Sequence, residues 1–99
     1  NYTIYIKNLN DNIPSRTMKE NLYILFSTYA DVIQVRYINK KNLRGQAWIV
    51  LSSKDEAKLA MRHCKGVSLF GKIPILEYSS NKSHIIQQLE DLLVDSESN

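Results

Sequence analysis

Short β-rich segments and amphipathic helical segments follow one another along this chain in an order that few folds accept. Alternating β-branched and aromatic residues predict strands at Thr3–Asn8, Val32–Ile38, Arg44–Ser52 and Ile73–Tyr78. A helical segment separates the first two strands, and another separates the last two. With right-handed crossovers, this order predicts an α+β, ferredoxin-like βαββαβ fold. We expect a four-stranded antiparallel sheet of order 4-1-3-2, with both helices on one face.

The two helical segments each carry their apolar residues on one side. In the first, Ser15 after Pro14 is the expected N-cap. Its apolar residues at helical spacing are Met18, Leu22, Leu25, Phe26 and Tyr29. The second runs from Asp55 to Cys64 and ends close to Gly66. Its apolar face comprises Ala57, Ala60, Met61 and Cys64, so we interpret Cys64 as a small core residue rather than a nucleophile.

A third amphipathic segment closes the chain. Ser83 is its expected cap, and its apolar stripe comprises Ile85, Ile86, Leu89, Leu92 and Leu93. We therefore expect a main domain at residues 1–82, a C-terminal helix at 83–94 and an acidic tail at 95–99. This helix either covers the open face of the sheet until a ligand displaces it, or packs at the sheet edge without blocking that face. The sequence leaves both arrangements open.

Charge and composition narrow the range of possible functions. The formal net charge is +3, but residues 1–82 hold thirteen basic and six acidic residues, which favours polyanionic partners. One Cys and two distant His residues, His63 and His84, exclude a disulfide framework and a closed zinc site. We expect no metal and no cofactor. Neither a membrane span nor a signal peptide is visible, so we expect an intracellular protein.

The open face carries the functional signal. Because side chains alternate along a strand, Ile4 and Ile6 in the core turn Tyr5 outward with Thr3 and Lys7. On the third strand Ala47, Ile49 and Leu51 fit the core, which turns Gln46, Trp48 and Val50 outward. Two aromatic rings on a basic sheet offer stacking surfaces for unstacked bases. The alternative is that Tyr5 and Trp48 pack against the protein itself, for example against the last helix.

Two stretches on these strands resemble the signatures of the RNA-recognition-motif family. The shorter is Ile4-Tyr5-Ile6-Lys7-Asn8-Leu9 and the longer is Arg44-Gly45-Gln46-Ala47-Trp48-Ile49-Val50-Leu51. Gln46 at the third position of the longer one is similar to a small spliceosomal branch, which holds the U1 A and U2 B-double-prime proteins. The resemblance spans residues 2–86 and is greater to the B-double-prime type, because one domain is followed by an acidic tail.

The resemblance implies binding of a small nuclear RNA hairpin, of U2 snRNA in the first place, within a nuclear splicing particle. Tyr5 and Trp48 would stack bases, Asn8 and Gln46 would bind base edges, and Arg44 would lie where the loop closes on its stem. The segment 39–43 would thread the loop, and residues 79–82 would contact bases through the backbone. The candidate RNA-binding residues are Tyr5, Lys7, Asn8, Asp11, Arg36, Lys40, Lys41, Leu43, Arg44, Gln46, Trp48, Lys72, Glu77, Ser79, Ser80 and Lys82.

A second surface is expected on the first helix. At 100° per residue, Glu20 and Ile24 point away from the buried stripe, with Tyr23 beside them. The resemblance implies a partner for this side, the leucine-rich-repeat A-prime protein of the U2 particle. The candidate partner-binding residues are Arg16, Lys19, Glu20, Tyr23 and Ile24.

Other functions fit less well. An acylphosphatase-like enzyme needs a glycine loop with a catalytic Arg, and the turn at residues 9–12 has neither, so we expect no catalysis. A peptide-binding relative of the RNA-recognition motif would lack the aromatics and carry an Arg-x-Phe in the loop before the last strand. Here both aromatics are present and residues 67–71 contain no Arg. A U1 A-type hairpin binder remains the alternative within the branch.

Overall fold

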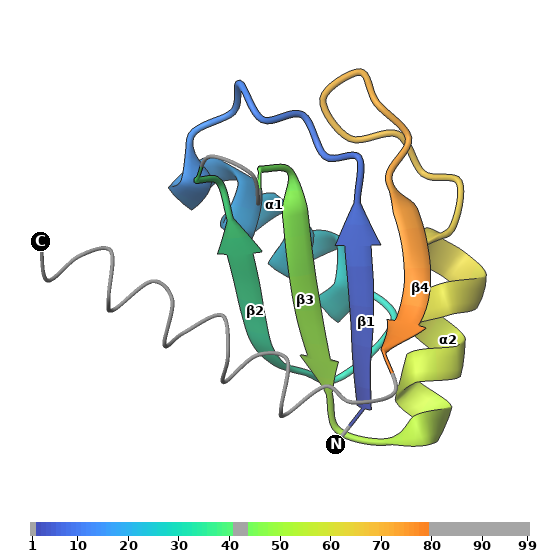
Figure 1. The fold of residues 1–99 in the computed structure, drawn as a ribbon. Coiled ribbons are helices and arrows are strands. Elements are labelled where there is room, and N and C mark those ends of the chain that lie inside the picture. The colour runs from blue at the N-terminus through green and yellow to red at the C-terminus, as the bar shows by residue number, and fades with distance from the viewer. Residues whose placement is uncertain (1, 41–43, 80–99) are drawn as a thin grey trace, which may run out of the picture.

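The structure is a computed structural model that describes residues 2–40 and 44–79. Its elements are β1 (Tyr2–Lys7), α1 (Ser15–Ser27), β2 (Val32–Ile38), β3 (Gln46–Leu51), α2 (Lys54–Cys64) and β4 (Ile75–Ser79). The four strands form one antiparallel sheet of order β2-β3-β1-β4, with β3 and β1 at its centre (Figure 1). The βαββαβ order and the strand order predicted from the sequence are confirmed. The expected terminal helix at 83–94 and acidic tail lie outside the described residues.

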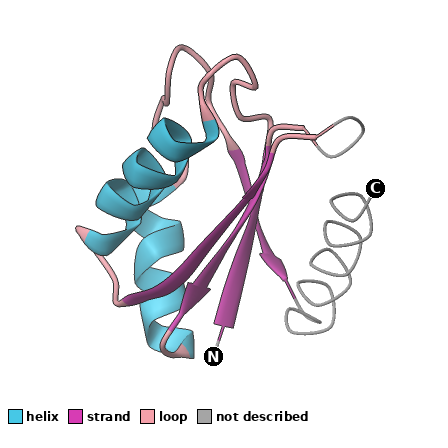
Figure 2. Ribbon diagram, turned by 90° about the vertical axis from the view of Figure 1, so that its left-hand side faces the viewer, coloured by secondary structure: helices cyan, strands magenta, loops and turns pink. Residues whose placement is uncertain are grey.

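Both helices lie on the same side of the sheet, and the core lies between the helices and the sheet (Figure 2). Ile4, Ile6, Ala47, Ile49 and Leu51 face the helices and are 0% exposed, as strand alternation predicted. From the helices, the core receives Met18, Leu22, Phe26, Ala57, Ala60 and Cys64. The core interpretation of Cys64 is confirmed, since burial raises the pKa of its thiol to about 11.

The ends of α1 differ from the prediction. Pro14, not Ser15, is the N-cap residue, and no side chain caps this end. Pro14 has an extended backbone (ψ 143°), so the helical conformation begins at the next residue, Ser15. Tyr29 lies beyond the helix and is 39% exposed, with its ring stacked on His63 at 4.5 Å, so it is not part of the buried stripe. His63 is exposed.

The second strand has the predicted bounds, but the third and fourth strands are shorter than predicted. The third begins at Gln46 rather than Arg44, and the fourth begins at Ile75 rather than Ile73. Gly45 therefore lies in the turn before β3, not inside the strand. It has φ +69°, and a Cβ atom there would stand 2.7 Å from the main-chain oxygen of Leu9. The two backbone segments thus approach closely at this glycine, and the Leu9 N–H donates to Gly45 O at 3.1 Å.

α2 begins with a side-chain cap. Ser53 Oγ accepts a hydrogen bond from the Glu56 N–H. Asp55 and Glu56 occupy the first turn, where negative charge interacts favourably with the helix dipole. In the described part of the chain, no helix is both long and apolar enough to cross a membrane.

Candidate nucleic-acid interface

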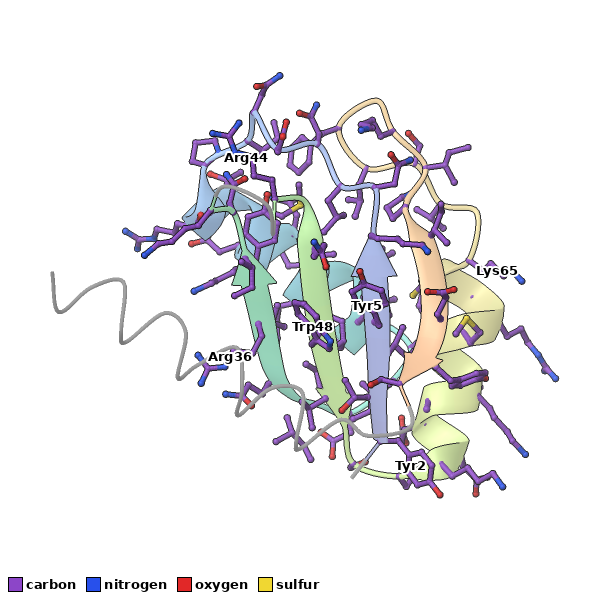
Figure 3. The ribbon with its side chains drawn as sticks, in the orientation of Figure 1. Tyr2, Tyr5, Arg36, Arg44, Trp48 and Lys65 are labelled. Carbon is purple, nitrogen blue, oxygen red and sulfur yellow. The ribbon has the colours of Figure 1, made fainter. Side chains whose placement is uncertain are left out.

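The candidate site is the sheet face opposite the helices, on which no other described element lies. The cross-strand register sets its side chains in rows. The central row reads Arg36, Trp48, Tyr5 and Glu77 across the four strands. Residues far apart in the sequence are thus direct neighbours, and the two aromatics occupy the middle of the sheet (Figure 3).

The two rings form a pair. Their centroids lie 5.1 Å apart with an interplanar angle of 34°, within the range of favourable aromatic contacts. The Tyr5 hydroxyl donates a hydrogen bond to Gln46 Oε1 at 2.7 Å. This bond leaves the NH2 group of the Gln46 amide as the donor it can offer to a ligand. The pair and the amide therefore form one ordered unit that combines ring faces with a polar edge.

Trp48 is less accessible than predicted. It faces away from the core cluster, as alternation requires, but its exposed fraction is only 4%, and that of Val50 is 8%. Part of the reason is the Tyr5 ring packed against it. Tyr5 is half-buried and is the more accessible ring. The alternative that the last helix covers these rings concerns residues outside the described ranges.

The charged candidates around the pair are engaged in different ways. Lys7 Nζ lies 3.5 Å from Glu77 Oε1, so the phosphate-binding lysine expected here is balanced by a carboxylate. Both side chains are about half exposed, and such pairs contribute little stability. Arg36 lies on β2 beside Trp48, and Arg44 lies in the turn before β3 (Figure 3).

Asn8 follows β1 and has a left-handed backbone conformation, with φ 65°. Asn tolerates this region better than most residues. Its side-chain amide donates to Ile73 O at 3.2 Å, so the base-contacting side chain expected from the family is partly used within the protein. The contact also ties the end of β1 to the loop before β4.

The remaining candidates are spread over the loops. Asp11 lies in the loop after β1, where its charge adds to burial in raising the pKa of Tyr37. Lys40 is exposed at the end of the β2 segment. Lys72 is paired through its backbone with Leu69 in the loop before β4, away from the sheet face. Lys41, Leu43, Ser80 and Lys82 lie outside the described residues. Ser79 ends β4.

One residue of this face was missing from the candidates. Thr3 stands opposite both Val50 and Ser79 and is 1% exposed. Within the described ranges, neither Thr3 Oγ1 nor Ser79 Oγ has a hydrogen-bond partner, although both atoms are buried. Buried hydroxyls ordinarily find partners. Alternation placed Thr3 on this face, but no sequence signal showed that its hydroxyl lacks a partner.

The candidate partner-binding residues lie together on α1. Tyr23 and Ile24 are 51% and 63% exposed on the outer side of α1, as predicted. Arg16 pairs with Glu20 at 3.3 Å. A cavity of about 420 Å³ lies between α1 and β2, lined by Lys19, Glu20, Tyr23, Ile24, Ile33, Gln34 and Val35.

Three lining residues of this cavity, Ile33, Gln34 and Val35, were not among the candidates, and Ile33 is the exposed apolar one. Strand pairing shifts by one residue between Val32 and Gln34, which marks a β-bulge. The bulge allows Val32, Val35 and Tyr37 to contact the core together, whereas strict alternation does not. It leaves Ile33 52% exposed beside the apolar residues of α1.

No group of three or more His, Cys, Asp or Glu side chains in residues 2–40 and 44–79 is arranged to hold a metal ion. The site is therefore described by its rings, amides and charges. A sheet face that carries an aromatic pair on its two middle strands, with no other described element over it, is the type of surface that binds single-stranded nucleic acid.

Comparison with known proteins identifies the class. The family model described as "RNA recognition motif (a.k.a. RRM, RBD, or RNP domain)" matches residues 3–99. The protein "Probable U2 small nuclear ribonucleoprotein B''" of Schizosaccharomyces pombe is 37% identical over 87 residues, which are 88% of this chain and 78% of that protein. "U1 small nuclear ribonucleoprotein A" of Drosophila melanogaster is 30% identical over 90 residues, 91% of this chain but 42% of the relative.

Solved structures agree on the fold. A complete computational redesign of human U1A protein superposes with a TM-score of 0.72 at 21% identity, covering 86% of this chain and 90% of that one. The chain belongs to the RNA recognition motif family, within the group of U1 A and U2 B'' small nuclear ribonucleoproteins.

Proposed function

We propose that this chain binds the hairpin loop of U2 snRNA as part of the U2 small nuclear ribonucleoprotein in pre-mRNA splicing. The observation that carries the proposal is the Tyr5–Trp48 pair at the centre of the sheet, hydrogen-bonded to Gln46. The two relatives that are 37% and 30% identical to this chain are named as small nuclear ribonucleoproteins. We place the activity in the nucleus, as binding without catalysis.

The bases of the loop would lie across the central row of the sheet. Tyr5, the more accessible of the two rings, would stack a base, and Trp48 beside it would stack another. Gln46 and the unpartnered hydroxyls of Thr3 and Ser79 supply hydrogen bonds to base edges. Phosphates would meet Arg36, Lys40 and Arg44 around the margin. The salt bridge between Lys7 and Glu77 would have to open for Lys7 to contact phosphate.

We further propose that the outer side of α1 docks the leucine-rich-repeat A-prime protein. Supporting this, the groove between α1 and β2 combines exposed Tyr23, Ile24 and Ile33 with charged Lys19 and Glu20. An apolar centre with a charged rim is typical of protein interfaces. This surface lies on the helix side of the sheet, so the partner and the RNA would bind without competing.

Recovery of the bound RNA tests the proposal. The tagged protein is crosslinked in nuclear extract, purified and its RNA sequenced, with a Tyr5→Ala variant as the matched control. Enrichment of U2 snRNA that is lost in the variant is the expected result. Enrichment of U1 snRNA instead would support the A-type alternative, and enrichment of no small nuclear RNA would refute both.

A further inference from the structure

A second groove lies where α2 meets the ends of β1 and β4. Thr3 and Ser79, which the RNA-binding account uses, are part of its lining, but its remaining lining residues on α2 and its two tyrosines have no part in that account. Its volume is about 280 Å³. The fully buried Ala57 methyl lies at its floor, and the Tyr2 and Tyr78 rings line it from the strands. Tyr2 has the same strand parity as Ile4, and Tyr78 the same as Leu76, so both rings point to the helix side. The two rings therefore wall the groove on the helix side of the sheet, and Thr3 and Ser79 complete its lining at the strand ends.

The groove has exposed aromatic walls and a cationic rim. Tyr78 is 57% exposed and Tyr2 39% exposed, which is unusual for two large rings beside one apolar hollow. Lys54 and Lys58 project from the first two turns of α2 at its border. No acidic side chain lines it. An apolar centre between lysines therefore fits a ligand with an apolar side chain next to negative charge.

The positive charge continues along α2 beyond the groove. Lys54, Lys58, Arg62 and Lys65 follow one another at four, four and three residues, so they form a stripe along one side of the helix. All four are exposed, and none takes part in an ion pair with another described residue. Figure 3 shows Lys65 extending from α2 on the outer side of β4. Of the two carboxylates in the first turn, Glu56 accepts a hydrogen bond from the Asp31 N–H, and Asp55 is exposed between Lys54 and Lys58.

The spacing of the stripe matches an extended polypeptide. Successive cations four residues apart on a helix are separated by about 6 Å. Alternate residues of an extended strand are about 6.6 Å apart. β4, the outermost strand, pairs only with β1 among the described strands, so its outer backbone groups face this same edge. An extended acidic segment would therefore meet a lysine or arginine at every second residue.

We propose that this groove and stripe dock an extended acidic segment of another protein, anchored by one aromatic or large aliphatic side chain over Ala57. Tyr2 and Tyr78 would enclose the anchor, and the cations of α2 would pair with carboxylates that flank it. A peptide fits better than RNA, because the groove is a hollow of side-chain size and the β4 edge presents peptide groups that only another polypeptide can match in register. The inference does not depend on the proposed RNA binding.

The test uses the full chain and a fluorescein-labelled peptide, Glu-Asp-Glu-Leu-Glu-Asp-Glu. Polarisation gives its affinity, and amide chemical shifts of the 15N-labelled protein give its location. The rim variant Lys54→Gln with Lys58→Gln removes two charges at the groove, and Arg16→Gln with Lys19→Gln removes the same number from α1. Loss of two exposed ion pairs should weaken binding about 2- to 30-fold in the rim variant, with a smaller change in the control.

Tyr78→Ala distinguishes the contribution of the anchor side chain from that of the charges, since it removes one aromatic wall of the groove and leaves every cation in place. The proposal expects shifts concentrated at the start of α2 and the end of β4, and weaker binding in this variant. It is overturned if the peptide does not bind, if the rim and control variants lose affinity equally, or if the shifts lie elsewhere. Stronger shifts of the same amides with oligouridine than with the peptide would also overturn it, because the surface would then be a nucleic-acid site.

Discussion

Replacing Trp48 by Ala tests both the stability of the fold and RNA binding, because the ring is almost fully buried yet lies outside the core on the helix side. With 4% of Trp48 exposed, nearly all of its surface returns to water on unfolding. Deleting such a ring costs about 3–5 kcal/mol of stability. The free energy of unfolding of a small domain is roughly 5–15 kcal/mol in total. The variant should therefore be folded at low temperature but unfold at a lower denaturant concentration.

The same change should weaken hairpin binding by about 1–3 kcal/mol, the contribution of one stacked base, which is roughly 5- to 150-fold in Kd. Urea unfolding measures the first effect, and a titration of labelled hairpin at 10 °C measures the second. Val50→Ala is the matched control, since Val50 lies two residues further on the same face and is also buried. If Val50→Ala weakens RNA binding as much as Trp48→Ala, the loss reflects destabilisation, and the stacking argument is wrong.

Three further changes test other parts of the structure. Gly45→Ala should cost at least about 1–2 kcal/mol in urea unfolding, because φ +69° is left-handed and the added Cβ would meet Leu9 O; an unchanged midpoint would contradict that contact. The raised pKa of Cys64, about 11, keeps the folded thiol protonated while the unfolded thiol ionises from about 9. Stability should therefore fall between these pH values by up to about 1.4 kcal/mol per pH unit, and Cys64→Ala should lack this component. Ile24→Asp with Tyr23→Ala should abolish A-prime binding in a pull-down and leave hairpin binding unchanged, because both side chains are exposed; unfolding of the variant would place them in the core.

Regular alternation made the central strands predictable. Ile4, Ile6, Ala47 and Ile49 face the helices, as period two requires, and this places Tyr5 and Trp48 together on the other face. Both assignments follow from local patterns that the tertiary structure does not override. The exposed outer side of α1 was predictable for the same reason, since a helix has a fixed angle per residue.

The features that were not predicted depend on contacts between distant segments. The bulge that exposes Ile33 breaks alternation by one residue and leaves no composition signal. The low exposure of Trp48 and the use of the Asn8 amide by Ile73 O depend on how neighbouring segments pack. The salt bridge of Lys7 with Glu77 joins residues seventy positions apart. A single sequence shows such pairs only after the strand register is known.

Trp48 is the only tryptophan of the chain, so its fluorescence reports directly on the proposed interface. The central claim is that RNA loop bases bind the sheet face that carries Trp48 and Tyr5. Titration of the protein with the U2 snRNA hairpin should change Trp48 emission in a saturable way, with the same Kd as a label on the RNA. A fully paired duplex of the same stem should cause little change. Tight binding of the hairpin that leaves Trp48 emission unaltered would place the RNA elsewhere on the molecule and contradict the account.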